Sequence, residues 1–268
     1  MKIGIIGYGV VGKAIDYTLS KSFEIVKYDK FFSYSDFNEL KLCEVVFISV
    51  PTPFDCKDYK VDDSAIIESL KKLEGLNYGG IVIIKSTVPP GSTNRYLSDF
   101  NLKIVFNPEF LRESTTPNED FENQDTIVIG TSSINDYEIV KRMYEEVALD
   151  SAEYFHTSPS EAEMIKCSQN TMLASRVALA NIIYDACIEN DVNYDKVKKI
   201  AFDRFEILGP HMTLVPGPDG SRGFGGKCLP KDIRAFSTIH DSTLLNSLIA
   251  YNDTLRSDLS IFLKNYKE

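Results

Sequence analysis

Short apolar runs recur along the first half of the chain, separated by stretches in which apolar residues return every three or four positions. The runs are rich in β-branched residues, which is typical of strands covered by helices on both faces. They predict strands at residues 3–6, 24–28, 45–50, 81–85, 103–106 and 126–130. Helical periodicity at 62–73 and 135–147 fills two of the gaps. This alternation predicts a doubly wound parallel α/β sheet over residues 1–155.

The second half follows a helical period instead. A capped start at Ser158 leads into one continuous pattern that reaches about Asn190. Shorter helical pieces follow, then helices at 230–239 and 244–264, so residues 156–268 are expected to form an all-helical domain. The long helix is apolar on more than one face, which predicts burial between domains or in a homodimer. The residues concerned are Met172, Leu173, Val177, Leu179, Ile182 and Ile183.

Composition narrows the class of protein. The net charge of -10 leaves no basic stretch dense enough for nucleic acid. The five cysteines are scattered without zinc-ligand spacing, which predicts no metal site and a reducing, cytoplasmic environment. The N-terminus is too short and broken for a signal peptide, and no run approaches a membrane span. A soluble protein that does not bind membranes is expected.

A glycine fingerprint follows the first predicted strand directly. In the segment Gly7-Tyr8-Gly9-Val10-Val11-Gly12, the first glycine permits the turn, the second admits a pyrophosphate and the third lets the helix pack closely. Asp29 ends the second strand, where a carboxylate binds both ribose hydroxyls and favours NAD over NADP. Lys30, its neighbour, could tolerate a 2'-phosphate. These residues predict a dinucleotide site, against the alternative of a plain turn.

Three further strand ends carry distinctive residues, and ligands of such sheets lie off the carboxyl ends of the strands. They are Val50-Pro51-Thr52-Pro53, Lys85-Ser86-Thr87-Val88-Pro89-Pro90-Gly91 and Asn107-Pro108-Glu109-Phe110-Leu111-Arg112-Glu113. The prolines are also explained as strand breakers. The glutamates at 109 and 113 could form an ordinary surface pair, but their place at a strand end favours a functional site.

Two features of the second half point to chemistry. Lys166 and Asn170 are four residues apart on the long helix, so they share a face and could hold an oxyanion, although such a pair is often only a polar stripe. A loop rich in glycine and proline, 209–226, then leads to Cys228. Glycines permit close approach and the adjacent lysines favour a thiolate, so Cys228 is interpreted as a reactive thiol rather than an incidental loop cysteine.

Taken together, these motifs resemble the UDP-glucose/GDP-mannose dehydrogenase family. The resemblance rests on the glycine fingerprint, the 86–91 and 107–113 segments, the Lys166 and Asn170 pair and the block Gly223-Phe224-Gly225-Gly226-Lys227-Cys228-Leu229-Pro230-Lys231-Asp232. These occur in family order across the first 232 residues. The resemblance implies a four-electron oxidation of a sugar-nucleotide alcohol, with UDP-glucose as expected substrate, to a carboxylate with two NAD.

The resemblance also implies roles for individual residues. Cys228 would form a thiohemiacetal and then a thioester. Lys166 and Asn170 would stabilise oxyanions, and Asp232, with Thr87 and Glu109, would orient water and move protons. The implied cofactor contacts are the 7–12 segment, Asp29, Lys30, Val50, Thr52, Pro53, Ser86, Thr87 and Glu113, the last near the nicotinamide. The implied substrate contacts are Glu109, Phe110, Leu111, Lys166, Asn170, Gly223, Phe224 and Gly225.

The chain departs from the family in two respects. Members usually continue into a third domain that completes the nucleotide site, so this chain is a natural short form, a truncation, or the partner of a separate polypeptide that supplies the rest. Glu206-Ile207-Leu208-Gly209 stands where an arginine usually precedes an isoleucine-glycine pair, and Arg204 or Arg222 could replace it.

Two other functions remain open at this point. One is a single-step dehydrogenase of the β-hydroxyacid or 6-phosphogluconate type, which needs no thiol. The other is a non-catalytic NAD-binding remnant of the family.

Overall fold

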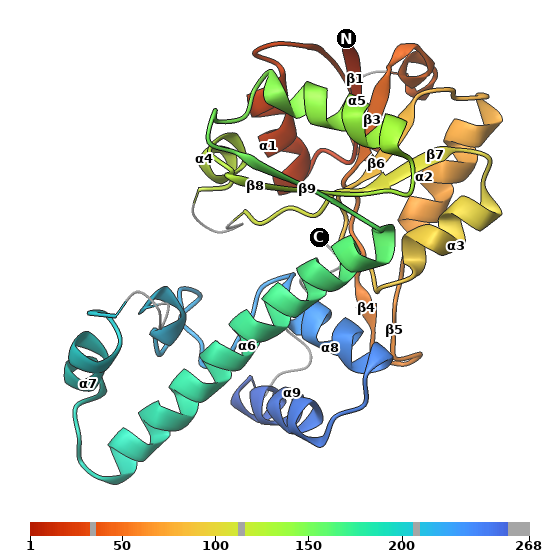
Figure 1. Cartoon of the computed structure of the whole chain (residues 1–268). Coiled ribbons are helices and arrows are strands. Elements are labelled where there is room, and N and C mark those ends of the chain that lie inside the picture. The colour runs from red at the N-terminus through yellow and green to blue at the C-terminus, as the bar shows by residue number, and fades with distance from the viewer. Residues whose placement is uncertain (33–35, 112–115, 206–209, 257–268) are drawn as a thin grey trace. The chain divides into compact units, whose positions relative to one another are not determined.

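The computed structural model describes residues 1–32, 36–111, 116–205 and 210–256 (Figure 1). The chain divides into two compact units. The first contains Met1–Thr52 and Val61–Lys166, and the second contains Pro53–Lys60 and the chain from Cys167 onward. Helix α6 (Pro159–Glu189) begins in the first unit and continues into the second.

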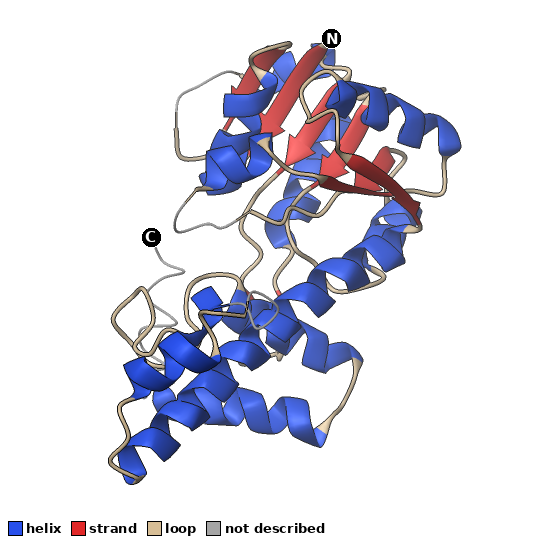
Figure 2. Cartoon of the chain, turned by 60° about the vertical axis from the view of Figure 1, so that its left-hand side comes forward, coloured by secondary structure: helices blue, strands red, loops and turns tan. Residues whose placement is uncertain are grey.

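A seven-stranded sheet forms the centre of the first unit, with the order β2-β1-β3-β6-β7-β8-β9 (Figure 2). Its strands are β1 (Lys2–Ile6), β2 (Glu24–Tyr28), β3 (Val45–Ile48), β6 (Ile81–Ile84), β7 (Lys103–Phe106), β8 (Thr126–Gly130) and β9 (Glu153–Thr157). Six of them are the strands that the apolar runs predict. Strands β3 and β6 end one or two residues earlier than expected, which leaves Val50 and Lys85 in the connections that follow.

One strand pair differs from the prediction of a fully parallel sheet. Each neighbouring pair is parallel except β7 and β8, which are antiparallel at Phe106 and Gly130. The run Thr126–Gly130 reads as a buried strand in either direction, because an apolar pattern carries no information on strand polarity. The fold is therefore a mixed, mostly parallel Rossmann-like sheet.

Helices cover both faces of this sheet. They are α1 (Val10–Leu19), α2 (Ser64–Gly75), α3 (Ser92–Asp99), α4 (Pro117–Glu122) and α5 (Ile134–Glu145), with a 3-10 helix at Phe37–Leu42. One core cluster joins α1, α4 and α5 to one face, and another joins α2, α3 and the 3-10 helix to the other. Burial on both faces explains why the strands are continuously apolar. Helix α3 was not predicted, because Ser92-Thr93-Asn94-Arg95 has no apolar stripe.

The second unit is mainly helical. It contains most of α6, then α7 (Tyr194–Ala201), a 3-10 helix at Pro210–Thr213, α8 (Leu229–Ile239) and α9 (Thr243–Leu255). A small hairpin, β4 (Phe54–Asp55) with β5 (Lys60–Val61), was not predicted because two-residue strands show no period. The predicted last helix extends to residue 264, and its part from 257 lies outside the described residues.

Helix α6 corrects one expectation. Among the described residues it is the helix that is long and apolar enough to cross a membrane by length and composition. The expectation that no segment approaches the length of a membrane span is therefore wrong for this helix. The same test is passed by core helices of soluble proteins, so it is weak support for a membrane segment.

Candidate active site

The glycine turn after β1 has the geometry that a dinucleotide requires. Gly7 adopts a φ of 88°, and a Cβ there would lie 2.7 Å from the carbonyl oxygen of Ser49. A Cβ on Gly12 would lie 2.1 Å from the carbonyl oxygen of Gly7, so the helix can approach the turn only with glycine at this position. A Cβ on Gly9, in contrast, would meet no atom within 4 Å. Since Gly9 also caps the N-terminus of α1, its exposed backbone can receive a pyrophosphate.

Tyr8, inside this turn, is anchored by its side chain. Its hydroxyl hydrogen-bonds the carboxylate of Asp16, which also lies 2.6 Å from the Lys27 ammonium. Burial, followed by the bond to Asp16, raises the pKa of Tyr8. Val10 and Val11 form the first turn of α1 beyond it. The turn is thus tied to both α1 and β2.

Asp29 lies beside the glycine turn, as the fingerprint predicts. Its Oδ2 accepts a hydrogen bond from the Tyr8 amide at 2.7 Å, and its Oδ1 accepts one from the Phe31 amide at 2.9 Å. The Lys30 ammonium lies 3.3 Å from the Glu68 carboxylate. Asp29 is thus fixed beside the turn, as a carboxylate that binds ribose hydroxyls requires.

The ends of β3 and β6 are joined by side chains. Ser86 Oγ donates to the Val50 carbonyl oxygen at 2.7 Å, and Thr52 Oγ1 donates to the Thr87 carbonyl oxygen at 2.9 Å. Both hydroxyl groups are largely buried. The structure therefore brings these four predicted residues together, while Pro53 begins the segment that belongs to the second unit.

A buried lysine joins the ends of β6 and β7. Lys85 is 2% exposed, and its ammonium donates to Asn107 Oδ1 at 3.0 Å and to the Pro108 carbonyl oxygen at 3.3 Å. Burial lowers the pKa of Lys85 to about 7. Asn107 also accepts from the Tyr144 hydroxyl at 2.6 Å and donates to the Val128 carbonyl oxygen at 2.6 Å. Sequence reasoning did not assign a role to Lys85, although a lysine that directly follows an apolar strand is a recognisable signal.

Glu109 and Lys166 form a buried ion pair in the first unit. Lys166 Nζ lies 3.2 Å from Glu109 Oε2, and both side chains are at least nine-tenths buried. Lys166 also lies over the Phe110 ring, 5.6 Å from its centroid. Phe110 and Leu111 pack against opposite core clusters, which anchors the segment that carries Glu109. Glu113, predicted near the nicotinamide, lies outside the described residues.

In the second unit, Cys228 caps the N-terminus of α8. Its carbonyl oxygen accepts from the Asp232 amide at 2.8 Å, and its side chain is partly exposed. The Asp232 side chain is fully buried, with Oδ2 bonded to Asn170 Nδ2 and Oδ1 2.8 Å from the Lys231 ammonium. Among the described residues, Oδ1 accepts no aligned hydrogen bond. Asn170 of α6 thus meets the predicted residues Cys228 and Asp232 around the first turn of α8, 62 positions along the chain from Asp232.

Gly223, Phe224 and Gly225, which precede this turn, are held by other elements of the second unit. Phe224 is buried, and Asn252 of α9 hydrogen-bonds both its amide and its carbonyl oxygen. Asn252 was missed from the sequence because its partners lie 28 positions away. The Arg222 guanidinium pairs with Asp185 at 2.5 Å, which gives it a partner on α6. Residues 206–209, where the family's arginine motif is expected, lie outside the described residues.

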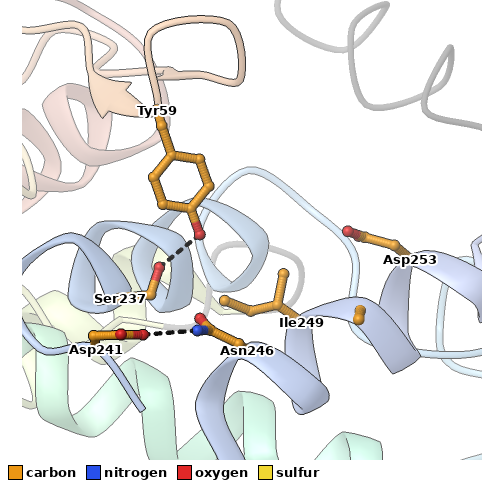
Figure 3. Close-up of a pocket in the computed structure, with 7 residues that line it drawn as sticks. Tyr59, Ser237, Asp241, Asn246, Ile249 and Asp253 are labelled. Carbon is orange, nitrogen blue, oxygen red and sulfur yellow. Dashed lines mark hydrogen bonds between the residues drawn. The ribbon is translucent and has the colours of Figure 1, made fainter. Parts of the chain in front are cut away.

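A pocket in the second unit lies away from these predicted residues. It is lined by Tyr59, Ser237, Asp241, Asn246, Ile249, Ala250 and Asp253 (Figure 3). Its polar groups largely bond one another, since the Tyr59 hydroxyl lies 2.9 Å from Ser237 Oγ and Asn246 donates to Asp241 at 2.9 Å. None of the predicted site residues lines it.

Comparisons with known proteins agree with the sequence motifs. Residues 18–148 match the NAD binding domain of the UDP-glucose/GDP-mannose dehydrogenase family, and residues 160–254 match its central domain. A UDP-glucose 6-dehydrogenase of Rickettsia bellii is 34% identical over 240 residues, which is 87% of this chain and 52% of that protein. One of Campylobacter jejuni is 33% identical over 189 residues, or 70% and 46%. The chain spans about half the length of these curated relatives.

Solved structures share the fold. A UDP-glucose dehydrogenase of Pyrobaculum islandicum superposes with a TM-score of 0.79 at 24% identity, over 94% of this chain and 68% of that one. A GDP-mannose dehydrogenase of Pseudomonas aeruginosa gives a TM-score of 0.67 at 25% identity, over 95% and 69%. The glycine turn with Asp29 agrees with the NAD binding domain that the family comparison identifies. Since both matched domains occur in family order, the chain belongs to the UDP-glucose/GDP-mannose dehydrogenase family.

Proposed function

We propose that the chain acts in the NAD-dependent oxidation of UDP-glucose to UDP-glucuronate, the activity of a UDP-glucose 6-dehydrogenase. The observation that carries this proposal is the arrangement at the start of α8, where Cys228 stands at a helix N-terminus beside a buried Asp232 bonded to Asn170. A helix N-terminus stabilises negative charge, as a thiolate nucleophile requires. A single-step dehydrogenase needs no such group.

The cofactor site is assigned to residues around the glycine turn. Gly7, Gly9, Gly12 and Asp29 would hold NAD, with the joined ends of β3 and β6 completing the site. NAD supplies the hydride acceptor for each of the two oxidation steps. The protein supplies the orientation of the substrate, the proton transfers and the thiol.

The proposed sequence of steps balances with one thiol and one water. The C6 alcohol loses a hydride and a proton to give an aldehyde. The Cys228 thiolate adds to the carbonyl carbon, and the alkoxide that forms takes up a proton to give a thiohemiacetal. The thiohemiacetal then loses a second hydride and that proton to become a thioester. Water then cleaves the carbon-sulfur bond, which yields the carboxylate and regenerates the thiol. Two hydrides leave per sugar.

Each charged intermediate has a proposed partner. Lys166 and Asn170, with their nitrogen donors on α6, are assigned to the oxyanions that form on C6. Asp232 is assigned to the hydrolytic water, because its carboxylate lies at the same helix turn as Cys228, with Oδ1 2.8 Å from the Lys231 ammonium. Glu109 and Thr87 are assigned to water orientation and proton transfer in the first unit, where Lys166 holds Glu109.

The first test replaces the thiol. Cys228→Ser should lower formation of the acid at least about a hundredfold, because a serine hydroxyl is a much weaker nucleophile toward the aldehyde than a thiolate. The measurement counts NADH and sugar acid formed per UDP-glucose consumed. The matched control is Cys56→Ser, which changes an exposed cysteine in the second unit.

The outcomes separate the alternatives. Two NADH per sugar in the unmodified protein, lost in Cys228→Ser, support the thioester route. One NADH supports a single-step dehydrogenase, and none despite NAD binding supports a non-catalytic remnant. Undiminished two-NADH turnover in Cys228→Ser would exclude the mechanism. Rival sugar nucleotides in the same assay test the choice of substrate.

Assembly and location belong to the same proposal. Helix α6 exposes Met172, Leu179, Ile182 and Ile183, whose spacing places them on one side, and this supports a homodimer that buries that surface. A reducing cytoplasm is proposed as the location, because the five cysteines are scattered along the sequence without paired spacing. A separate polypeptide that completes the nucleotide site would appear as a requirement for added protein in the turnover assay.

A further inference from the structure

The loop that precedes Cys228, here called the Cys228 loop, contains the dipeptide Gly223-Phe224. Both amides and both carbonyl oxygens of this dipeptide are hydrogen-bonded to side chains. The Gly223 amide donates to Asn181 Oδ1 at 3.1 Å, and Arg256 donates to the Gly223 carbonyl oxygen at 2.9 Å. The Phe224 amide donates to Asn252 Oδ1 at 2.7 Å, and Asn252 Nδ2 donates to the Phe224 carbonyl oxygen at 3.2 Å. Loop backbone is commonly bonded to water or neighbouring backbone, so this dipeptide is unusually fixed.

The Phe224 side chain anchors the same point in the core. It is 2% exposed and packs in a cluster with Ile233 of α8 and Leu245 and Ile249 of α9. Cys228 follows only four residues later. A displacement of Phe224 would therefore be transmitted to the thiol over a short length of chain.

Two glycines of this loop, Gly223 and Gly225, are explained by the approach of Asn252 and Arg256. Gly223 has a φ of 76°, and a Cβ there would lie 2.5 Å from Asn252 Oδ1. A Cβ on Gly225 would lie 2.4 Å from Arg256 Nη1. Side chains at these positions would push the two α9 residues away. The glycine pattern thus serves contact with α9 in addition to any approach of a ligand.

Asn252 and Arg256 lie four residues apart at the end of α9, so they share one side of it. Arg256 Nη1 also donates to Asp219 Oδ2 at 2.7 Å, four residues before Gly223 in the same loop. The end of α9 therefore contacts the loop at Asp219 and at the Gly223 and Phe224 dipeptide. Asn252 is buried, whereas Arg256 is only partly so.

We propose that Asn252 and Arg256 are positioning residues that fix the Cys228 loop through the backbone of Gly223 and Phe224. They touch neither the thiol nor any reacting atom in this role. The proposal rests on the proposed function of Cys228. Its test uses readouts that need no turnover, so the two can fail separately.

The experiment compares Asn252→Ala and Arg256→Ala with Thr254→Ala, a control at an exposed position of the same helix. Hydrogen exchange is followed for the Gly223 and Phe224 amides, and alkylation by iodoacetamide is mapped at each cysteine. In Asn252→Ala the Phe224 amide should exchange about tenfold faster, because its bond to Asn252 is lost, and the Gly223 amide, which keeps its bond to Asn181, should exchange faster by a smaller factor. Cys228 should be alkylated several-fold faster, while Cys56, exposed in the same protein, keeps its rate.

Arg256→Ala should shift both readouts in the same direction by a smaller factor, and it guards against failure of Asn252→Ala to fold. In turnover assays, Asn252→Ala should lower kcat about tenfold with the KM for NAD unchanged, which a general loss of structure would not produce. Wild-type exchange and alkylation in folded Arg256→Ala and in folded Asn252→Ala would overturn the proposal. If Asn252→Ala does not fold, wild-type values in Arg256→Ala alone overturn it. Formation of fewer than two NADH per UDP-glucose by the unmodified protein would instead count against the proposed function.

Discussion

Lys85 is held almost entirely out of water, with two oxygen acceptors and an aromatic ring around its ammonium. Burial lowers its pKa to about 7, with Glu109 acting in the opposite sense and Lys166 in the same sense. An unfolded lysine has a pKa of about 10.4. Between these values the unfolded chain binds a proton that the folded chain does not, so stability rises with pH over this interval.

Lys85→Met is predicted to remove this pH dependence. From pH 7 to pH 9 the wild-type free energy of unfolding should gain up to about 1.4 kcal/mol per pH unit from this group, relative to the variant. The variant should also lose about 2 kcal/mol at pH 9, because Asn107 and Pro108 lose their donor. Urea unfolding at several pH values measures both effects.

Lys103→Met, which changes an exposed lysine on β7, is the matched control and should follow the wild-type profile. Parallel profiles for wild type and Lys85→Met would show that Lys85 does not titrate in this interval.

Single residues in the site differ in how far the sequence reveals them. The glycines and Asp29 were predictable because their roles depend on backbone conformation within one strand-turn-helix unit. Lys85 and Asn107, in contrast, meet across 22 positions, and Asn170 and Asp232 across 62. Local periodicity specifies which face of an element a residue occupies, but not which partner it meets there. The contacts of Asn252 could not be predicted for the same reason.

At the scale of elements, the N-terminus of α3 has no capping side chain of its own and is capped by a residue of another helix. Gly91, its N-cap, has a φ of 95° and no side chain to bond the first amides. Glu163 of α6 supplies the acceptor, receiving the Gly91 amide at 2.6 Å, the Thr93 amide at 2.7 Å and the Thr93 hydroxyl at 2.6 Å. Glu163 is fully buried, so these bonds also attach the start of α6 to the first unit.

Glu163→Ala should therefore destabilise the first unit by about 3 kcal/mol, because three donors lose their acceptor in a buried place. The destabilisation by Glu163→Gln should be smaller, since the amide oxygen of glutamine can still accept hydrogen bonds. Urea unfolding gives the free energies, and hydrogen exchange should show faster opening at the start of α3. The control is Glu189→Ala, at the exposed end of the same helix. Equal stability of Glu163→Ala and the control would contradict this account.

The elements that the sequence predicted are those with a clear period or a continuous apolar run. The hairpin of β4 and β5 and the polar helix α3 have neither. The direction of β8 was also missed, because the composition of an apolar strand carries no information on its direction. Strand polarity is a tertiary property, which explains this error.

At the scale of the whole molecule, the second half of α6 is the clearest unexplained surface. Leu179 is 54% exposed, and Ile182 and Ile183, three and four positions later on the same side of the helix, are also exposed. Exposure of such an apolar surface to water is unfavourable, and its burial against a partner lowers the free energy of the assembly. The homodimer proposed above would provide that cover.

Leu179→Asp should weaken such a dimer, because it places a charge at a position that the partner would bury. Light scattering at micromolar concentration should give a dimer for the wild type and a dissociation constant at least about tenfold higher for the variant. Leu244→Asp is the control, since Leu244 is 71% exposed at the start of α9 and also changes a leucine to an aspartate. A monomeric wild type, or equal weakening by both variants, would show that α6 does not form the interface. A specific effect of Leu179→Asp would place the exposed half of α6 at the centre of the assembly, on the same helix that carries Lys166 and Asn170.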